Sequence, residues 1–186
     1  MKRARQARVA GEPMRDRYEK VLELLDAEGP HLHRLLARLT RREDVAGDLL
    51  QELVIRLCQS GGLEKAQDPF AYAYRAAVNL AFEWRRRRRA CVHRTVEKRD
   101  TPAGAPSPLG AVIREEELER VLDAAGRLNH VVRDAVLLRY LEQMSYEEIA
   151  RRLSKKPQHV RSLTSKALAQ LRAWLQKDNG DEIDGG

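Results

Sequence analysis

One stretch in the middle of the chain fits neither a helix nor a sheet. Residues 101–108 read TPAGAPSP and hold three prolines in eight positions. Proline fixes φ and has no amide hydrogen to donate, so we expect an extended, flexible linker here. The chain should therefore fold as two modules, residues 15–95 and 113–178, separated by a Pro-rich linker over residues 96–112.

Apolar residues in both modules recur every three or four positions, which is the spacing of one face of a helix. The alternation typical of strands is not visible. The sequence predicts an all-α fold of two small helical domains. The expected boundaries in the first domain are a start near Arg15, a break at Gly29–Pro30, a third helix after Thr40, a stop at Ser60–Gly62, and a helix opened by Asp68 as N-cap and Pro69.

The charge of the chain suggests its class of partner. It has 186 residues, a net charge of +7 and only 5% aromatic residues. Such a basic balance favours a polyanion, most often nucleic acid, over a solvated surface without a partner. Residues 1–14 are expected to be a basic disordered arm, without the apolar core of a secretory signal, and residues 179–186 an acidic tail. Met14 offers an alternative start.

The second domain contains a helix-turn-helix pattern. SYEEIARRL begins with Ser145 and Glu148, the spacing of a capping box. A short turn at Ser154–Lys156 leads to Pro157 and a second helix with one polar face. A helix presented in this way fits the DNA major groove, where Arg can bond guanine in a bidentate way. The alternative is a helical hairpin whose polar face is only solvated. The candidate DNA-contacting residues are His159, Arg161, Ser162, Ser165 and Lys166.

The segment DAVLLRYLEQMSYEEIARRLSKKPQHVRSLTSKALAQL resembles the promoter-reading C-terminal module of bacterial sigma factors. The similarity is greatest to the small extracytoplasmic-function (ECF) group of the sigma-70 family. The resemblance implies that the five residues above read the −35 element. The chain departs from the family pattern at three places, which puts base specificity in doubt more than the fold. They are Ser154–Lys155 in place of Gly-apolar, Asn129–His130 in place of Pro-Pro, and Leu163–Thr164 in place of Arg-Leu.

The first domain carries a separate match. GPHLHRLLARLTRREDVAGDLLQELVIRL resembles the helix pair that docks on core RNA polymerase in this family. Its specific part is the D-x-x-Q-E string of Asp48, Gln51 and Glu52, which the helical spacing places on one face, with Arg56 continuing that face. The resemblance implies that this face binds the clamp helices of the largest polymerase subunit. The alternative is a solvated helix surface.

The helix DPFAYAYRAAVNLAFEWRRRRR resembles the family's −10 helix. Tyr72, Arg75 and Asn79 fall on the matching motif positions. Aromatic faces can stack unpaired bases, while Arg and Asn can bond phosphates and base edges. Five consecutive arginines wrap round the helix axis, so the run is expected to give sequence-blind phosphate contacts. The full set of candidate −10 contacts is Phe70, Tyr72, Arg75, Asn79, Trp84, Arg85 and Arg86. Phe70 and Trp84 fit a core role equally well.

The resemblance implies a cytoplasmic sigma factor that binds core polymerase, directs promoter recognition and opens DNA. Its implied partners are the clamp helices, the flap of the second-largest subunit, promoter DNA and an anti-sigma factor. It should be a monomer when free of polymerase. No catalytic constellation, metal site or cofactor motif is visible, and Cys58 and Cys91 are expected to be reduced thiols, so an enzyme is not expected. The alternatives are a stand-alone helix-turn-helix regulator and a sigma-mimicking interaction protein.

Overall fold

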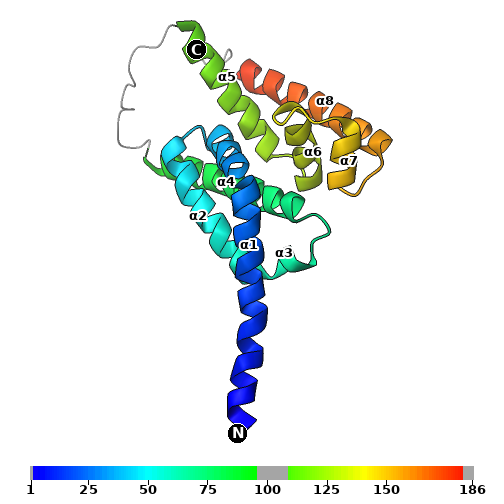
Figure 1. Cartoon of the computed structure of the whole chain (residues 1–186). Coiled ribbons are helices and arrows are strands. Elements are labelled where there is room, and N and C mark those ends of the chain that lie inside the picture. Colours follow the sequence, from blue (N-terminus) through cyan, green and yellow to red (C-terminus); the bar gives the residue numbers. More distant parts are fainter. Residues whose placement is uncertain (1, 96–108, 182–186) are drawn as a thin grey trace. The chain divides into compact units, whose positions relative to one another are not determined.

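The computed structural model describes residues 2–95 and 109–181, and every described element is a helix. The chain divides into two compact units, one up to Arg88 and one from Arg89. The helices are labelled in Figure 1. Their bounds are α1 Lys2–Thr40, α2 Glu43–Ser60, α3 Gly62–Lys65, α4 Pro69–Thr95, α5 Leu109–Gly126, α6 His130–Tyr140, α7 Tyr146–Arg152 and α8 Pro157–Asp181. The predicted all-α class is confirmed.

The first unit is built round leucines of α1 and α2. Leu32, Leu36 and Leu39 of α1 are fully buried, as is Leu53 of α2. These side chains recur at helical spacing, so each helix buries one stripe and leaves the opposite face in water. Ala77 of α4 is equally buried, and its small side chain suits a site enclosed by other groups.

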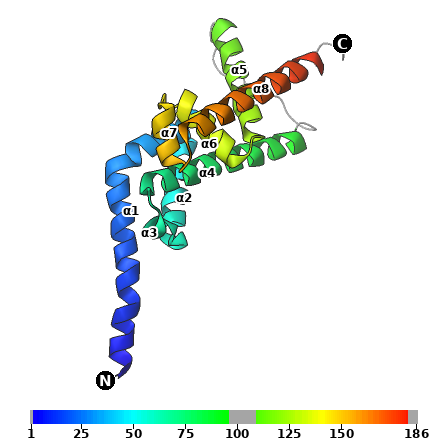
Figure 2. The same cartoon turned by 90° about the vertical axis from the view of Figure 1, so that its right-hand side faces the viewer.

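The helix boundaries differ from the sequence expectation in α1. The structure has a helix from Lys2, so residues 2–14 are helical instead of forming a disordered arm. This stretch contains three alanines and three arginines, and both residue types favour helix. Pro30 does not end a helix either. Figure 2 shows α1 changing direction part-way along its length, consistent with a proline that removes a backbone hydrogen bond without ending the helix.

The remaining boundaries agree more closely. Gly61 ends α2 at φ +58°, a left-handed conformation that favours glycine. Asp68 caps α4, since its Oδ1 accepts from the Ala71 amide at 2.9 Å. Of the expected linker, residues 96–108 lie outside the described residues and 109–112 belong to α5. Of the expected acidic tail, residues 179–181 belong to α8 and the rest lie outside the described residues.

The second unit packs α5, α6 and α7 against α8. Its core includes Ala124 and Leu128 from the α5 end, Val136 from α6, and Ala167 and Leu171 from α8. Trp174 and Leu175 extend this cluster along α8. One face of α8 is therefore occupied by packing, which leaves its opposite face exposed.

Two further findings bear on the class of protein. Both thiols, Cys58 and Cys91, are free of disulfide bonds, as expected. No helix within residues 2–95 and 109–181 combines the length and apolar character needed to cross a membrane.

Candidate functional site

The predicted polymerase-binding face lies on α2. Asp48 and Gln51 are exposed one turn apart, and Glu52 beside them is half-exposed. Leu49 and Leu53 on the opposite side of the helix are buried, which fixes the rotation of α2 and turns the acidic and amide groups outward. The expected juxtaposition of the three polar residues is therefore present.

Arg56 does not simply continue that face. Its guanidinium donates to Glu52 at 2.5 Å and to Glu83 of α4 at 3.2 Å. Arg87 donates to the other carboxylate oxygen of Glu83 at 2.6 Å. The hydrogen bond from Arg87, aided by Arg56, holds the pKa of Glu83 below its ordinary value. Arg56 thus joins α2 to α4.

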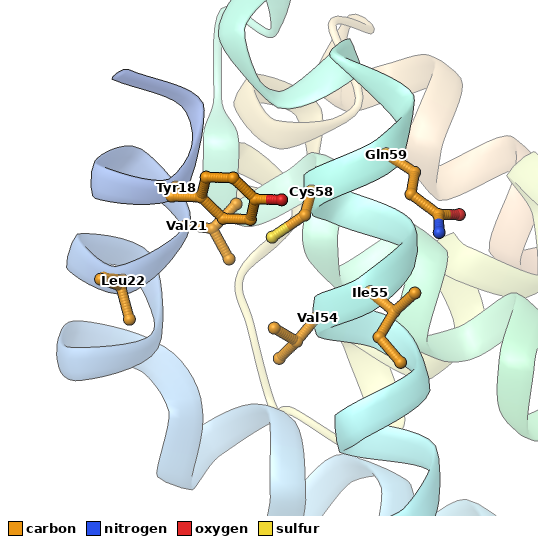
Figure 3. Close-up of a pocket in the computed structure, with 7 residues that line it drawn as sticks. All are labelled: Tyr18, Val21, Leu22, Val54, Ile55, Cys58 and Gln59. Atoms are coloured by element: carbon orange, nitrogen blue, oxygen red, sulfur yellow. The ribbon is translucent and has the colours of Figure 1, made fainter. Parts of the chain in front are cut away.

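An apolar groove adjoins this polar face. Figure 3 shows Tyr18, Val21 and Leu22 of α1 facing Val54, Ile55 and Cys58 of α2, with Gln59 at the rim. The cavity has a volume of about 320 Å³. Tyr18, Leu22 and Ile55 are 48%, 59% and 54% exposed, which is unusual for large apolar side chains that have a core nearby.

Sequence reasoning missed this groove, although a signal was present. Ile55 stands four residues after Gln51, on the face that the polar residues mark as exposed. Leu22 directly follows Val21, which is buried, so Leu22 falls outside the inward stripe of α1. Apolar residues on a polar face mark an interaction surface more often than a core.

Helix α4, which is predicted to contact the −10 element, uses several of its predicted contact residues for packing. Phe70 is only 8% exposed, and its ring meets His31 edge-on at 5.3 Å and Tyr74 at 5.9 Å. Phe70 is therefore a core aromatic, and its expected contact with DNA is corrected. Tyr72 is half-buried and donates its hydroxyl to Ser60 at 3.2 Å.

The Tyr72 ring also requires a glycine next to it. A Cβ atom at position 62 would lie 2.2 Å from the Tyr72 hydroxyl oxygen. The ring thus packs directly on the backbone where α3 begins, in the loop that precedes α4. Tyr72 therefore helps to fix the conformation of this loop. It is also one of the residues predicted to contact the −10 element.

The arginine run divides into structural and exposed members. Arg85 is 5% exposed and donates to the Leu39 carbonyl at 3.1 Å. It satisfies one of the orphan carbonyls at the C-terminus of α1, so its expected role in DNA binding is also corrected. Arg86 is exposed, as is Asn79, while Arg75 and Trp84 are half-buried. The guanidinium of Arg88 lies over the Trp84 ring at 5.6 Å.

The helix-turn-helix in the second unit has the predicted local chemistry. The Ser145 hydroxyl accepts from the Glu148 amide at 3.2 Å, and the Glu148 carboxylate accepts from the Ser145 amide at 2.8 Å. This capping box also holds the pKa of Glu148 below its ordinary value, chiefly through the Ser145 backbone hydrogen bond. Ser154 adopts φ +52°, the left-handed conformation in which serine costs about 1 kcal/mol relative to glycine.

The departures from the family pattern have local explanations. Asn129, where the pattern has proline, caps α6 by accepting from the Val131 amide at 3.1 Å. Thr164 is 1% exposed and donates its hydroxyl to the Val160 carbonyl at 3.0 Å. Both side chains form hydrogen bonds within the unit, so neither departure changes the outward face of α8.

That outward face carries the predicted −35 residues. Each of the five is exposed, while Val160, Ala167 and Leu171 on the other side of α8 are buried. The exposed set is His159, Arg161, Ser162, Ser165 and Lys166. Arg161 is in addition paired with Glu147 at 3.4 Å. An exposed polar face on a helix of this motif is the kind of surface that the major groove of DNA admits.

Family comparisons match each unit separately. The family model described as Sigma-70 region 2 matches residues 24–91, and the model described as Sigma-70, region 4 matches residues 118–171. The chain belongs to the sigma-70 family, in its ECF group. The region 2 match thus covers α2, with its side of the groove, and α4 up to residue 91, whereas Tyr18, Val21 and Leu22 precede it. The region 4 match covers the helix-turn-helix.

Among curated proteins, the chain is 32% identical to the ECF RNA polymerase sigma factor SigE of Mycolicibacterium smegmatis over 162 residues, which are 86% of this chain and 63% of SigE. It is 27% identical to the ECF RNA polymerase sigma factor SigK of Mycobacterium sp. strain KMS, over 70% of each chain. The chain therefore spans somewhat less than two thirds of the length of SigE. A solved complex of the sigma factor RpoE with the anti-sigma factor NepR from Bartonella quintana aligns with a TM-score of 0.46 and 21% identity, covering 83% of this chain and 95% of that chain.

Proposed function

We propose that this chain is a promoter-specificity factor of RNA polymerase. The observation that carries the proposal is the pairing of two different surfaces in one chain. Unit 1 offers a polar face beside an apolar groove, a combination suited to a protein partner. Unit 2 offers a basic, exposed helix face suited to duplex DNA.

The docking surface on core polymerase consists of the polar face and the groove together. Asp48 and Gln51 provide charge and hydrogen-bond acceptors, while Leu22 and Ile55 provide the apolar area that a stable interface needs. The proposed partner is the pair of clamp helices of the largest subunit. An anti-sigma factor that covers this surface would keep the chain from polymerase in the cytoplasm.

The DNA surfaces act in sequence. The exposed face of α8 holds the −35 duplex, with the flap of the second-largest subunit supporting this unit. Tyr72, Arg75, Asn79, Trp84 and Arg86 of α4 take the opened −10 strand, where stacking on an aromatic ring is worth about 1–3 kcal/mol per base. The chain carries no chemistry of its own and leaves RNA synthesis to the polymerase.

The test is run-off transcription with purified core polymerase and a genomic promoter library. The full chain should direct transcripts from a defined set of promoters sharing −35 and −10 elements. Core binding without promoter-dependent transcripts would favour the sigma-mimicking alternative. Binding to a palindromic duplex as a dimer, without affinity for core polymerase, would favour the stand-alone regulator.

The docking surface has its own test. Asp48→Lys combined with Glu52→Lys should weaken core binding, since both changes place positive charge on the polar face. Glu116→Lys combined with Glu117→Lys is the matched control, because it makes the same change of charge at two exposed carboxylates of the other unit. Unchanged polymerase affinity of the Asp48/Glu52 variant, measured by fluorescence anisotropy on folded protein, would refute this surface.

A further inference from the structure

Tyr146, the first residue of α7, lies beneath two guanidinium groups. The Cζ of Arg139 is 4.8 Å from the centre of its ring, and the Cζ of Arg161 is 5.3 Å from it. Arg139 is itself fixed, because it is half-buried and donates to the Met144 carbonyl at 2.8 Å. The half-buried ring is thus held in place on one helix of the helix-turn-helix while it contacts an arginine of the other.

Arg161 is otherwise a long side chain in water. Its side chain is 55% exposed, and its second contact is the Glu147 carboxylate at 3.4 Å, which is 60% exposed. An exposed ion pair of this kind is screened by solvent and orients its partners weakly. A planar guanidinium against an aromatic ring is more directional, because both groups are flat and the ring face is electron-rich.

The orientation of the Arg161 guanidinium matters for the base contact that it would make. Bidentate bonding to guanine requires the two donor groups to lie in the plane of the base pair. A side chain that must find this orientation on binding loses rotamer freedom, whereas one already restricted loses less. Restricting Arg161 before DNA arrives therefore raises discrimination between base pairs without any new contact to DNA.

We propose that Tyr146 is a positioning residue for −35 recognition, which acts by holding the guanidinium of Arg161 against its ring. The proposal rests on the proposed function, because it assumes that α8 reads promoter DNA. Glu147 has a secondary role, as a counter-charge that the incoming base edge displaces. Helix α7 thus contributes to −35 specificity, because its Tyr146 orients Arg161 of α8.

The test uses the full chain with core polymerase and a promoter selected by the wild-type protein. The measured quantity is the ratio of transcript from that promoter to transcript from versions with single −35 substitutions. Tyr146→Leu should lower this ratio about two- to fivefold, the range of an exposed cation–π contact. Tyr146→Phe keeps the ring and should leave the ratio unchanged.

A double-mutant cycle separates positioning from general stabilisation. Tyr146→Leu should have no further effect in an Arg161→Ala background, because there is then no guanidinium to orient. Tyr140→Leu, which removes an exposed tyrosine 47% accessible on α6, is the matched control and should not change the ratio. Circular dichroism checks folding, and Tyr146→Met replaces Tyr146→Leu if the latter does not fold.

Each other outcome overturns the proposal in an identifiable way. If the wild-type chain discriminates between promoters and Tyr146→Leu has the same ratio, the positioning role of Tyr146 is rejected. The proposed function would still stand. An equal loss in the wild-type and Arg161→Ala backgrounds, or a uniform fall in transcript from every promoter, would show that Tyr146 only stabilises the unit. Absence of promoter-dependent transcript from the wild-type chain would reject this role together with the proposed function.

Discussion

The two helices predicted to bind DNA use their side chains differently. On α8 all five predicted contact residues are exposed, and the buried residues lie on the opposite face. On α4 two of the seven predicted residues are buried, and Tyr72 packs on the backbone at Gly62. The comparison teaches that a polar residue opposite the single apolar stripe of its helix is available to a ligand, even when that helix contributes to the core as α8 does. A similar residue on a helix that is buried over much of its circumference, as α4 is, can instead be used in packing.

The position of each helix in its unit explains this contrast. Apolar α8 residues form one stripe, so packing and binding occupy separate faces. Helix α4 buries residues such as Ala73, Ala77, Val78 and Ala81 on much of its circumference. An arginine on such a helix can fold back to cap another helix, as Arg85 does at the Leu39 carbonyl.

The largest expected effect tests the buried member of the arginine run. Arg85→Ala should lower the free energy of unfolding by about 2–4 kcal/mol, because it leaves a buried carbonyl without its donor and creates a cavity. Arg86→Ala, its exposed neighbour, should leave stability unchanged and reduce the salt dependence of promoter binding. Urea unfolding and binding at several salt concentrations measure the two effects. Equal stability of the two variants would show that Arg85 is not needed for the fold. The reason given for the difference between α4 and α8 would then be wrong.

The second prediction concerns the exposed face of α8. Arg161→Ala should relax preference at one −35 position by about 1–3 kcal/mol, the usual contribution of a bidentate base contact. Core binding should not change, because Arg161 lies on the proposed DNA-facing side of α8 and outside the proposed docking surface on α1 and α2. Selection of promoters from a randomised −35 library measures the preference. A preference equal to that of the wild-type chain would mean that α8 is placed wrongly on DNA.

A third pair of substitutions tests the frame that presents α8, with effects of opposite sign. Ser145→Ala removes the N-cap of α7 and should cost about 1 kcal/mol of stability. Ser154→Gly relieves the left-handed backbone of the turn and should stabilise by up to about 1 kcal/mol. Thermal and urea unfolding measure both. Destabilisation by Ser154→Gly would contradict the turn geometry at φ +52°.

The smallest expected effect is the pH dependence of the link between α2 and α4. The pKa of Glu83 is lowered in the folded state, first by the hydrogen bond from Arg87. The carboxylate therefore contributes stability that is fully present above the unfolded-state pKa of about 4.3 and is lost as pH falls through the lower folded value. Because Glu83 is one-third exposed, the contribution should be below about 1 kcal/mol.

Glu83→Gln provides the comparison for this effect. The variant should lose part of the stability at neutral pH, and the difference from the wild-type chain should shrink as the pH is lowered below about 4.3. Urea unfolding at neutral and acidic pH measures it. A difference between the two proteins that grows on acidification would contradict the sign of the shift.

Much of the fold could be predicted from the sequence because its signals are local. The 3.6-residue periodicity predicted the helices of both units, and Asp68 and Ser145 cap helices where the pattern predicted caps. The predicted break at Pro30 was wrong, because α1 continues through this residue. A proline removes one hydrogen bond, and neighbouring packing decides whether the helix survives.

The sequence by itself determined the class, the two-part organisation and the exposed face of α8, because a helix with one apolar stripe has only one way to pack. Only the tertiary structure decided which residues of α4 are exposed and that Leu22 and Ile55 line one groove. It also decided that Arg56 pairs with Glu83 and that Arg161 lies on Tyr146. These contacts join residues that are distant in the chain. A local sequence pattern does not predict which distant residues will lie next to each other.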